Sequence, residues 1–214
     1  IIHAAKYAAK ADKQLIGVNV GRLGFAADVE PHEYEQLERL ITGDYTTEER
    51  ILLDVEVVKE DGSKHYLAVN DAVVARGQLS KTINLHLTLD GDEISKYRAD
   101  GLLFATPTGS TAYSLSAGGP ILAPKMECIL MTPVCPHSLF SRSVLFSGES
   151  ELSVHVKIPE ECCCVLTIDG EKNVPVLATD RVVIRKSDLK LKLALLHNRN
   201  FYKLLNEKLK EWDF

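Results

Sequence analysis

Three Asp-Gly pairs constrain the fold of this chain more than any other feature of its sequence. Asp61-Gly62 and Asp90-Gly91 each follow a run in which apolar residues alternate with polar ones, and Asp169-Gly170 follows the short apolar run 165–168. Asp-Gly between two such runs is the strongest short-range sign of a β-hairpin, because the tight turn needs residues that tolerate positive φ. Three hairpins predict an antiparallel, β-rich domain.

Other short apolar or alternating runs add strands to this domain. Period-two alternation places successive side chains on opposite faces of a sheet, which is the pattern of a half-buried strand. Further strands are expected at residues 72–75, 101–105, 144–146, 152–158 and 181–185.

The two ends of the chain have helical character instead. Residues 2–11 are rich in Ala and Lys and predict a helix, residues 15–20 predict a short strand, and residues 31–41 predict a surface helix. The end of the chain has apolar residues at helical spacing, which are Phe201, Leu204, Leu205, Leu209 and Trp212. We therefore expect an α/β domain at 1–49, closed by a C-terminal helix at 198–214, and a β-rich domain at 50–197.

Composition excludes several classes of protein. The formal net charge is −5 over 214 residues, which argues against a chain built mainly to bind nucleic acid. No apolar run reaches the roughly 20 residues that span a bilayer, and no signal sequence opens the chain, so neither a membrane nor a nucleic-acid partner is expected and the location is expected to be cytoplasmic. The five cysteines form no C-x-x-C pair, and no metal site is expected.

Residues 106–120 form the segment that is richest in chemistry. They read Thr-Pro-Thr-Gly-Ser-Thr-Ala-Tyr-Ser-Leu-Ser-Ala-Gly-Gly-Pro, with seven hydroxyl side chains and three glycines. A loop leading into a helix near Ser110 or Thr111 would present hydroxyls and backbone N–H groups to a ribose, a phosphate or an amide. A turn rich in capping residues explains the same composition equally well.

Two polar pairs accompany this segment. Asn70-Asp71 interrupts an apolar strand sequence, as either a turn or a ligand contact on a rigid element. Arg98 and Asp100 stand two residues apart, as a surface salt bridge or as partners for phosphate and hydroxyl groups.

In this order, five segments closely resemble the NAD kinase family: Gly-Arg-Leu-Gly-Phe at 21–25, Asn70-Asp71, Tyr-Arg-Ala-Asp-Gly at 97–101, residues 106–120 and residues 132–137. The resemblance covers nearly the whole chain. It implies an α/β plus β fold, with a partial Rossmann-like N-terminal domain and an antiparallel, sandwich-like C-terminal domain. It also implies transfer of a phosphoryl group from ATP to the adenosine-ribose 2′-hydroxyl of NAD, which gives NADP, with a divalent cation that is usually Mg²⁺.

The resemblance also implies the site residues. Asn70 and Asp71 would hold an NAD ribose, and Arg98 and Asp100 would lie beside the dinucleotide. The binding run would be Thr111, Ala112, Tyr113, Ser114, Leu115 and Ser116, in which the Tyr113 ring offers a flat face to a base. The further candidates are Thr108, Cys135, which stands where relatives often have another small residue, Glu171, which stands where many have Gln, and His3, which matches a position that is basic in many relatives.

The residue expected to perform catalysis is not among these candidates. NAD kinases carry Gly-Gly-Asp-Gly before a helix that resembles residues 1–9, and its aspartate would activate the 2′-hydroxyl. No Asp-Gly pair in this chain follows two glycines, and the chain opens without Met, so this aspartate is expected upstream of Ile1. Loss of a general base costs roughly 10²- to 10⁴-fold in rate. We therefore expect these residues to bind dinucleotide but to phosphorylate it poorly.

Two alternatives stay open at this stage. One is a non-catalytic dinucleotide-binding module, and the other is a related lipid or sugar kinase of the Gly-Gly-Asp-Gly group. The family resemblance further implies a homodimer or homotetramer that assembles through the β-rich domain.

Overall fold

The chain forms two compact units. Unit 1 contains Ile1–Arg50 and Leu189–Phe214, and unit 2 contains Ile51–Asp188. The computed structural model describes residues 1–20, 27–77, 82–138, 141–157, 164–197 and 200–210. Several expectations rest on residues outside this set, which are residues 21–25, Cys162, Cys163 and Trp212.

The second boundary differs from the expected one. Residues 189–197 were assigned to the β-rich domain, but they belong to unit 1. The reason is that β13 (Arg181–Leu195) is 15 residues long and continues beyond the expected strand at 181–185. Its last part pairs in parallel with β1 (Gln14–Leu15), which lies in unit 1.

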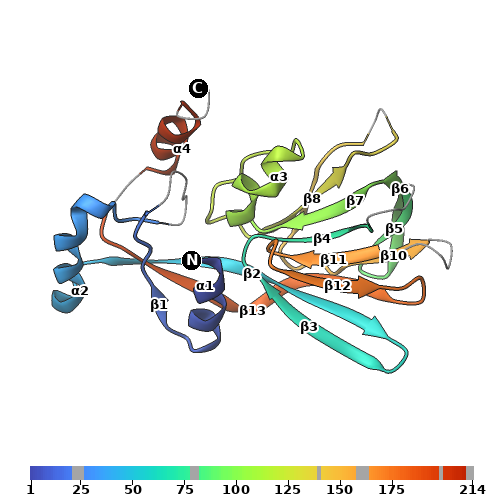
Figure 1. The fold of residues 1–214 in the computed structure, drawn as a ribbon, viewed down its shortest axis with the longest axis horizontal. Coiled ribbons are helices and arrows are strands. Elements are labelled where there is room, and N and C mark those ends of the chain that lie inside the picture. The colour runs from blue at the N-terminus through green and yellow to red at the C-terminus, as the bar shows by residue number, and fades with distance from the viewer. Residues whose placement is uncertain (21–26, 78–81, 139–140, 158–163, 198–199, 211–214) are drawn as a thin grey trace. The chain divides into compact units, whose positions relative to one another are not determined.

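Unit 2 is built from two mostly antiparallel sheets, which confirms the expected β-rich architecture (Figure 1). The first sheet has the order β3-β2-β13-β10-β5-β6, with β1 attached to β13, and the second has the order β12-β11-β4-β7-β8-β9. The remaining strands of the first sheet are β2 (Thr46–Lys59), β3 (Gly62–Ala68), β5 (Ile83–Leu89), β6 (Asp92–Ala99) and β10 (Leu152–Lys157). Those of the second are β4 (Asp71–Arg76), β7 (Gly101–Ala105), β8 (Cys128–Val134), β9 (Val144–Ser147), β11 (Cys164–Ile168) and β12 (Lys172–Val176).

All three Asp-Gly pairs lie at hairpins, as predicted. Asp90 and Gly91 have φ of 51° and 95°, and Asp169 and Gly170 have φ of 50° and 67°, so both turns use the left-handed region that these residues tolerate. The turn from β2 to β3 differs, because Lys59 pairs with Gly62 and only the glycine of its Asp-Gly pair has positive φ.

The main core of unit 2 draws alternate residues from both sheets. Leu85 and Val154 of the first sheet and Phe104 and Met131 of the second are fully buried in one hydrophobic cluster. A second cluster covers the other face of the second sheet, where Leu122 packs with strand residues such as Leu103. The segment after β7 therefore lies on the outer face of that sheet.

Unit 1 contains the short helical elements. These are α1 (Ile2–Lys10), a 3-10 helix η1 (Pro31–Glu38), α2 (Arg39–Thr42) and α4 (Phe201–Lys210). The helix expected at 31–41 is thus mostly 3-10 helix, opened by a capping box between Glu30 and Glu33. The strand expected at 15–20 is reduced to β1 and a single bridge between Val18 and Val29.

Unit 1 is also held together by a buried carboxylate. Asp28 is 7% exposed and accepts hydrogen bonds from the backbone N–H groups of Leu196 at 2.6 Å and His197 at 3.0 Å. This contact joins the start of the chain to the end of β13 and its following turn. A Rossmann-like arrangement of this unit stays a prediction.

A search of the described residues for a helix that is both long enough and apolar enough to cross a bilayer found none.

Candidate functional site

The polar pair Asn70-Asp71 stands where the chain enters β4. The carboxylate of Asp169, at the turn after β11, accepts hydrogen bonds from the backbone N–H groups of Val69 at 3.0 Å, Asn70 at 2.7 Å and Asp71 at 3.0 Å. In return the N–H of Asp169 donates to the Asp71 carbonyl at 2.9 Å. These three hydrogen bonds to one carboxylate fix the backbone of residues 69–71. The side chains of Asn70 and Asp71 take no part in these three hydrogen bonds.

The hydroxyl-rich segment packs against the same residues. The Thr106 hydroxyl donates to the Val69 carbonyl at 2.7 Å and accepts from the N–H of Gly109 at 3.0 Å. A Cβ on Gly109 would lie 2.0 Å from the Asn70 carbonyl oxygen, a distance at which only glycine fits. Glycine at 109 is therefore required by the close approach of two backbones.

The segment forms two single turns rather than the one helix expected. These are a 3-10 turn η2 (Thr108–Thr111) and α3 (Tyr113–Ser116), separated by Ala112 at φ −101° and ψ −129°. Because neither turn is long enough to build an appreciable helix dipole, the anion site expected at a helix N-terminus loses its basis.

Several hydroxyls of the segment serve the fold directly. The Ser110 hydroxyl donates to the Pro107 carbonyl at 2.7 Å and accepts from the N–H of Leu122 at 3.0 Å. Ser114 is fully buried and its hydroxyl lies 3.1 Å from that of Thr132. Ser110 and Ser114 therefore use their hydroxyls in hydrogen bonds within the fold, as the interpretation of the segment as a turn rich in capping residues predicts.

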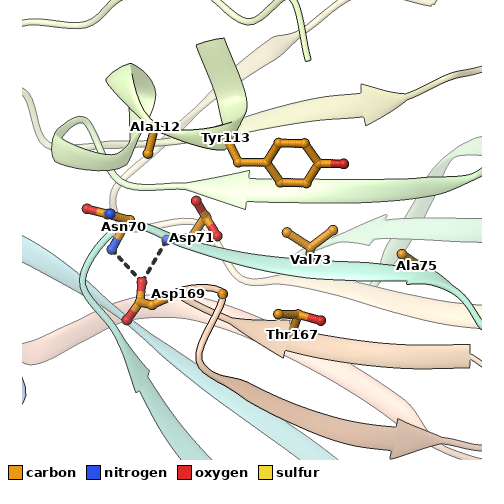
Figure 2. Close-up of a pocket in the computed structure, with 9 residues that line it drawn as sticks. Asn70, Asp71, Val73, Ala75, Ala112, Tyr113, Thr167 and Asp169 are labelled. Atoms are coloured by element: carbon orange, nitrogen blue, oxygen red, sulfur yellow. Dashed lines mark hydrogen bonds between the residues drawn. The ribbon is translucent and has the colours of Figure 1, made fainter. Parts of the chain in front are cut away.

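A cavity of about 480 Å³ opens beside these elements (Figure 2). Its walls come from β4, the end of β11 with its turn, and the junction of η2 and α3. The lining residues are Asn70, Asp71, Val73, Ala75, Ala112, Tyr113, Thr167, Asp169 and Gly170. Figure 2 shows the Tyr113 ring across the space from Val73 and Thr167. Asp71 is 5% exposed, whereas Tyr113 is 47% exposed.

A second cavity of about 680 Å³ continues past Tyr113. Ala75 and Tyr113 line both spaces, which we call the paired cavities. The second one is bounded further by Arg76, Gly77, Asp100, Val134, Cys135, Val165 and Asn173. Both volumes fall within the range of about 300–1,000 Å³ typical of small-molecule sites.

An ion pair stands at the wall of the second cavity. Arg76 Nε donates to Asp100 Oδ1 at 2.8 Å, and the N–H of Arg76 donates to the Asp100 carbonyl at 2.9 Å. The sequence suggested Arg98 as the partner of Asp100, but Arg98 Nε donates instead to the Thr82 hydroxyl at 3.2 Å. The strand pairing explains the difference, since β4 and β7 are neighbours and β6 lies in the other sheet.

The predicted site residues fall into three groups. Asn70, Asp71, Asp100, Ala112, Tyr113 and Cys135 line the paired cavities. Thr108, Thr111, Ser114, Leu115 and Ser116 belong to η2 and α3 without lining the cavities. Arg98 lies on β6, Glu171 follows the Asp169-Gly170 turn, and His3 lies on α1 of unit 1, where its ring meets that of Tyr7 edge-on at 5.2 Å.

Sequence reasoning missed Arg76, Asp169 and Asn173 as cavity residues. Asp169 was noticed only as a hairpin residue, although its carboxylate also accepts hydrogen bonds from the backbone of residues 69–71. Arg76 and Asn173 carry no local signal, because each simply ends or interrupts a strand pattern.

Burial controls the chemistry of the thiols near the site. Burial raises the pKa of the Cys164 thiol to about 12, and the thiol donates to the Ala75 carbonyl at 3.1 Å. Cys135 is exposed instead, at φ 46°. Within the described part of the chain no three His, Cys, Asp or Glu side chains gather in a way that could hold a metal ion.

Comparison with known proteins identifies relatives of this chain. The family model for the ATP-NAD kinase C-terminal domain matches residues 69–196. The chain is 40% identical to an NAD kinase of Natranaerobius thermophilus over 211 residues, which is 98% of this chain and 73% of that protein. It is 38% identical to an NAD kinase of Desulforamulus reducens, covering all of this chain and 74% of the relative.

Solved structures show the same likeness. A yeast NADH kinase complexed with NADH superimposes with a TM-score of 0.83 at 29% identity, and the match covers 92% of this chain but 59% of the yeast chain. An NAD kinase from Archaeoglobus fulgidus in complex with ATP superimposes with a TM-score of 0.76 at 26% identity, covering 92% of this chain and 74% of the other.

Proposed function

Because the chain belongs to the NAD kinase family, we propose that unit 2 binds NAD in the paired cavities for transfer of a phosphoryl group from ATP to the adenosine-ribose 2′-hydroxyl. The observation that carries this proposal is the position of Tyr113, whose side chain lines both cavities. A dinucleotide has two nucleoside halves, and two adjoining spaces that share an aromatic wall suit such a ligand.

The first cavity suits a ribose. The Asn70 amide offers both donors and an acceptor, and the Asp71 carboxylate offers acceptors, so together they match vicinal hydroxyls. Asp169 holds the backbone of both residues, which keeps their side chains in place before a ligand arrives. The largely apolar walls at Val73, Ala75 and Tyr113 suit the face of a base.

The second cavity has charged side chains in its wall. The Arg76 guanidinium lies at its wall and is oriented by Asp100, so it can attract a phosphate, while the carboxylate can accept from an amide or a hydroxyl. Arg98, Thr111, Ser116 and Glu171 remain proposed contacts for the outer parts of the ligand.

A divalent cation, usually Mg²⁺ in such kinases, would be held mainly by the nucleotide phosphates. Mg²⁺ keeps several waters and needs one or two carboxylates in addition to phosphates, and Asp71 is the carboxylate of the first cavity that is suited to this.

The aspartate expected to act as general base belongs to a Gly-Gly-Asp-Gly motif that these 214 residues do not contain. Binding, rather than turnover, is therefore the property to test on this chain. We also propose a cytoplasmic protein that assembles as a homodimer or homotetramer, without nucleic-acid or membrane partners in its kinase function.

The proposal is tested by calorimetric titration of NAD and NADP into the chain and into Asn70→Ala and Asp100→Ala variants. We expect binding that weakens in both variants while the melting temperature of each stays close to that of the parent protein. Tight binding that neither substitution affects would place the dinucleotide elsewhere. The rival assignment to a lipid or sugar kinase predicts that a panel of such substrates competes with NAD.

A further inference from the structure

One row of directly opposed residues runs across the outer face of the second sheet. Thr167 of β11 lies opposite Val73 of β4, Val73 lies opposite Leu103 of β7, and Leu103 lies opposite Thr132 of β8. Directly opposed residues point to the same face of a sheet. The row therefore joins the wall of the first cavity, at Thr167 and Val73, to Thr132, which lies two strands beyond Val73.

Thr132 is a polar residue in an otherwise apolar part of this face. It is 1% exposed, and its neighbours Leu103 and Leu130 belong to the buried cluster of the outer face. Valine has nearly the same shape and suits a buried strand position equally well, but it has no hydroxyl. Burying a hydroxyl costs free energy unless the group is hydrogen-bonded, so the hydrogen bonds of Thr132 are the reason to look for a specific role.

The Thr132 hydroxyl lies between two serines. Its oxygen is 3.1 Å from the hydroxyl oxygen of Ser114, on α3, and 3.0 Å from that of Ser143, which directly precedes β9. A hydroxyl can donate one hydrogen bond and accept others, so three hydroxyls in line can all be paired. Ser114 and Thr132 are both buried, where a hydrogen bond is stronger than in water. This contact ties α3 to the sheet at the end of the row.

The chain that follows α3 closes over this contact. The N–H of Gly119 donates to the Ser114 carbonyl at 2.8 Å. A Cβ on Gly119 would lie 2.4 Å from the Ser114 hydroxyl and 2.8 Å from that of Thr132, so only glycine leaves the two hydroxyls undisturbed. Ser114 is thereby held twice, through its hydroxyl by Thr132 and through its carbonyl by Gly119.

Tyr113 directly precedes Ser114 in α3. Consecutive residues of a helix point about 100° apart, so a turn that directs Ser114 into the sheet directs Tyr113 to one side. The Tyr113 ring lies across the first cavity from Val73 and Thr167, which belong to the same row as Thr132 (Figure 2). Because α3 is a single turn, it gains little rigidity from its own hydrogen bonds. The position of the ring above the row should therefore depend on how Ser114 is anchored.

We propose that Thr132 is a positioning residue for the dinucleotide, because its hydroxyl holds Ser114 and thereby fixes the Tyr113 ring opposite Val73 and Thr167. This inference rests on the proposed binding of NAD in the paired cavities. Threonine suits the role, since its branched Cβ restricts χ1 and so directs the hydroxyl. Ser114, which the family resemblance suggested as a ligand contact, acts in this arrangement through the position of α3.

The experiment compares Thr132→Val, which removes the hydroxyl and keeps the shape, with Thr132→Ser, which keeps the hydroxyl. NAD binding is measured by calorimetry. The Tyr113 ring is followed by NMR of protein that contains isotope-labelled tyrosine, and its signal is assigned by its loss in Tyr113→Phe. We expect Thr132→Val to weaken NAD binding about three- to tenfold and to shift the Tyr113 signal. Thr132→Ser should bind NAD within about twofold of the parent protein, although the missing methyl group lowers its melting temperature.

The matched control is Thr88→Val in the first sheet, which removes a part-buried contact between the hydroxyls of Thr88 and Ser153. It should lower the melting temperature about as much as Thr132→Val does, while NAD binding and the Tyr113 signal stay unchanged. Gly119→Ala disturbs the anchor by a second route, because its Cβ would displace the Ser114 hydroxyl. It should shift the Tyr113 signal as well.

A Tyr113 signal or an NAD dissociation constant that keeps its parental value in Thr132→Val would overturn the proposal. Equal weakening of NAD binding by Thr88→Val and Thr132→Val would do the same, because it would show a general effect of lost stability. Failure of Thr132→Ser to restore binding would exclude the hydroxyl as the cause. If the parent protein binds no NAD, the proposed function fails, and the Tyr113 signal alone then decides whether Thr132 positions the ring.

Discussion

The carboxylate of Asp169 accepts a hydrogen bond from the backbone N–H of Asn70 at 2.7 Å, although 99 residues separate the two in sequence. The same oxygen accepts from the N–H of Asp71 at 3.0 Å. A turn that closes one hairpin thereby fixes the entry to β4, where the two polar residues of the first cavity stand. The stability of this junction and the binding of the ligand should be coupled for that reason.

Asp169→Asn should destabilise unit 2 by about 1–3 kcal/mol, because an amide accepts the backbone hydrogen bonds less strongly than a carboxylate. Chemical denaturation followed by fluorescence measures the free energy of unfolding. Asp61→Asn, at the exposed turn between β2 and β3, is the matched control and should change it by less than about 0.5 kcal/mol. Equal effects of the two substitutions would show that the Asp169 contacts add no stability.

Gly109→Ala should displace the backbone of Asn70, because the added Cβ would lie 2.0 Å from its carbonyl oxygen. We expect a loss of about 2 kcal/mol or more in unfolding free energy, together with weaker NAD binding. Gly118→Asn is the control, since Gly118 has φ of 86° with open space around it and Asn tolerates that conformation. A Gly109→Ala protein as stable as the parent would contradict the close approach.

Tyr113→Ala should weaken NAD binding by about 1–3 kcal/mol, the range found when an aromatic platform for a base is removed. Tyr113→Phe keeps the ring and should bind within about threefold of the parent protein. Tyr34→Ala, which removes an exposed tyrosine of unit 1, should leave the dissociation constant unchanged. Calorimetry gives the dissociation constants of all three variants. Equal losses of NAD affinity in Tyr113→Phe and Tyr113→Ala would show that the hydroxyl, and not the ring, contributes to binding.

Cys164 should resist alkylation at pH 8 while Cys135 reacts. The pKa of the Cys164 thiol is raised to about 12 by burial, so almost none of it is thiolate at pH 8, and the side chain is also shielded. Cys135 is exposed. Iodoacetamide labelling followed by peptide mass spectrometry checks this, and labelling in denaturant is the control in which both cysteines must react. Rapid modification of Cys164 in the native protein would contradict its burial.

The local sequence determined the elements that depend on short-range chemistry. Three Asp-Gly pairs were enough to place three hairpins, and the alternating runs beside them gave most strands of unit 2, since both signals act over a few residues. The helix expected at 31–41 was partly wrong, because residues 31–38 form a 3-10 helix, a geometry that composition does not distinguish from an α-helix. The strand expected at 181–185 was too short, because β13 continues through the polar residues 186–188 into the alternating run 189–195, part of which pairs with β1.

For the paired cavities, the sequence and its family resemblance pointed to four residues that line them, Asn70, Asp71, Asp100 and Tyr113, and their contacts with a ligand stay a prediction. Only the tertiary structure decided that Asp100 pairs with Arg76 and that Asp169 holds Asn70. The physical reason is that these relationships join strands from distant parts of the chain. Register and sheet order arise from burying a shared core, and no local pattern of residues encodes them.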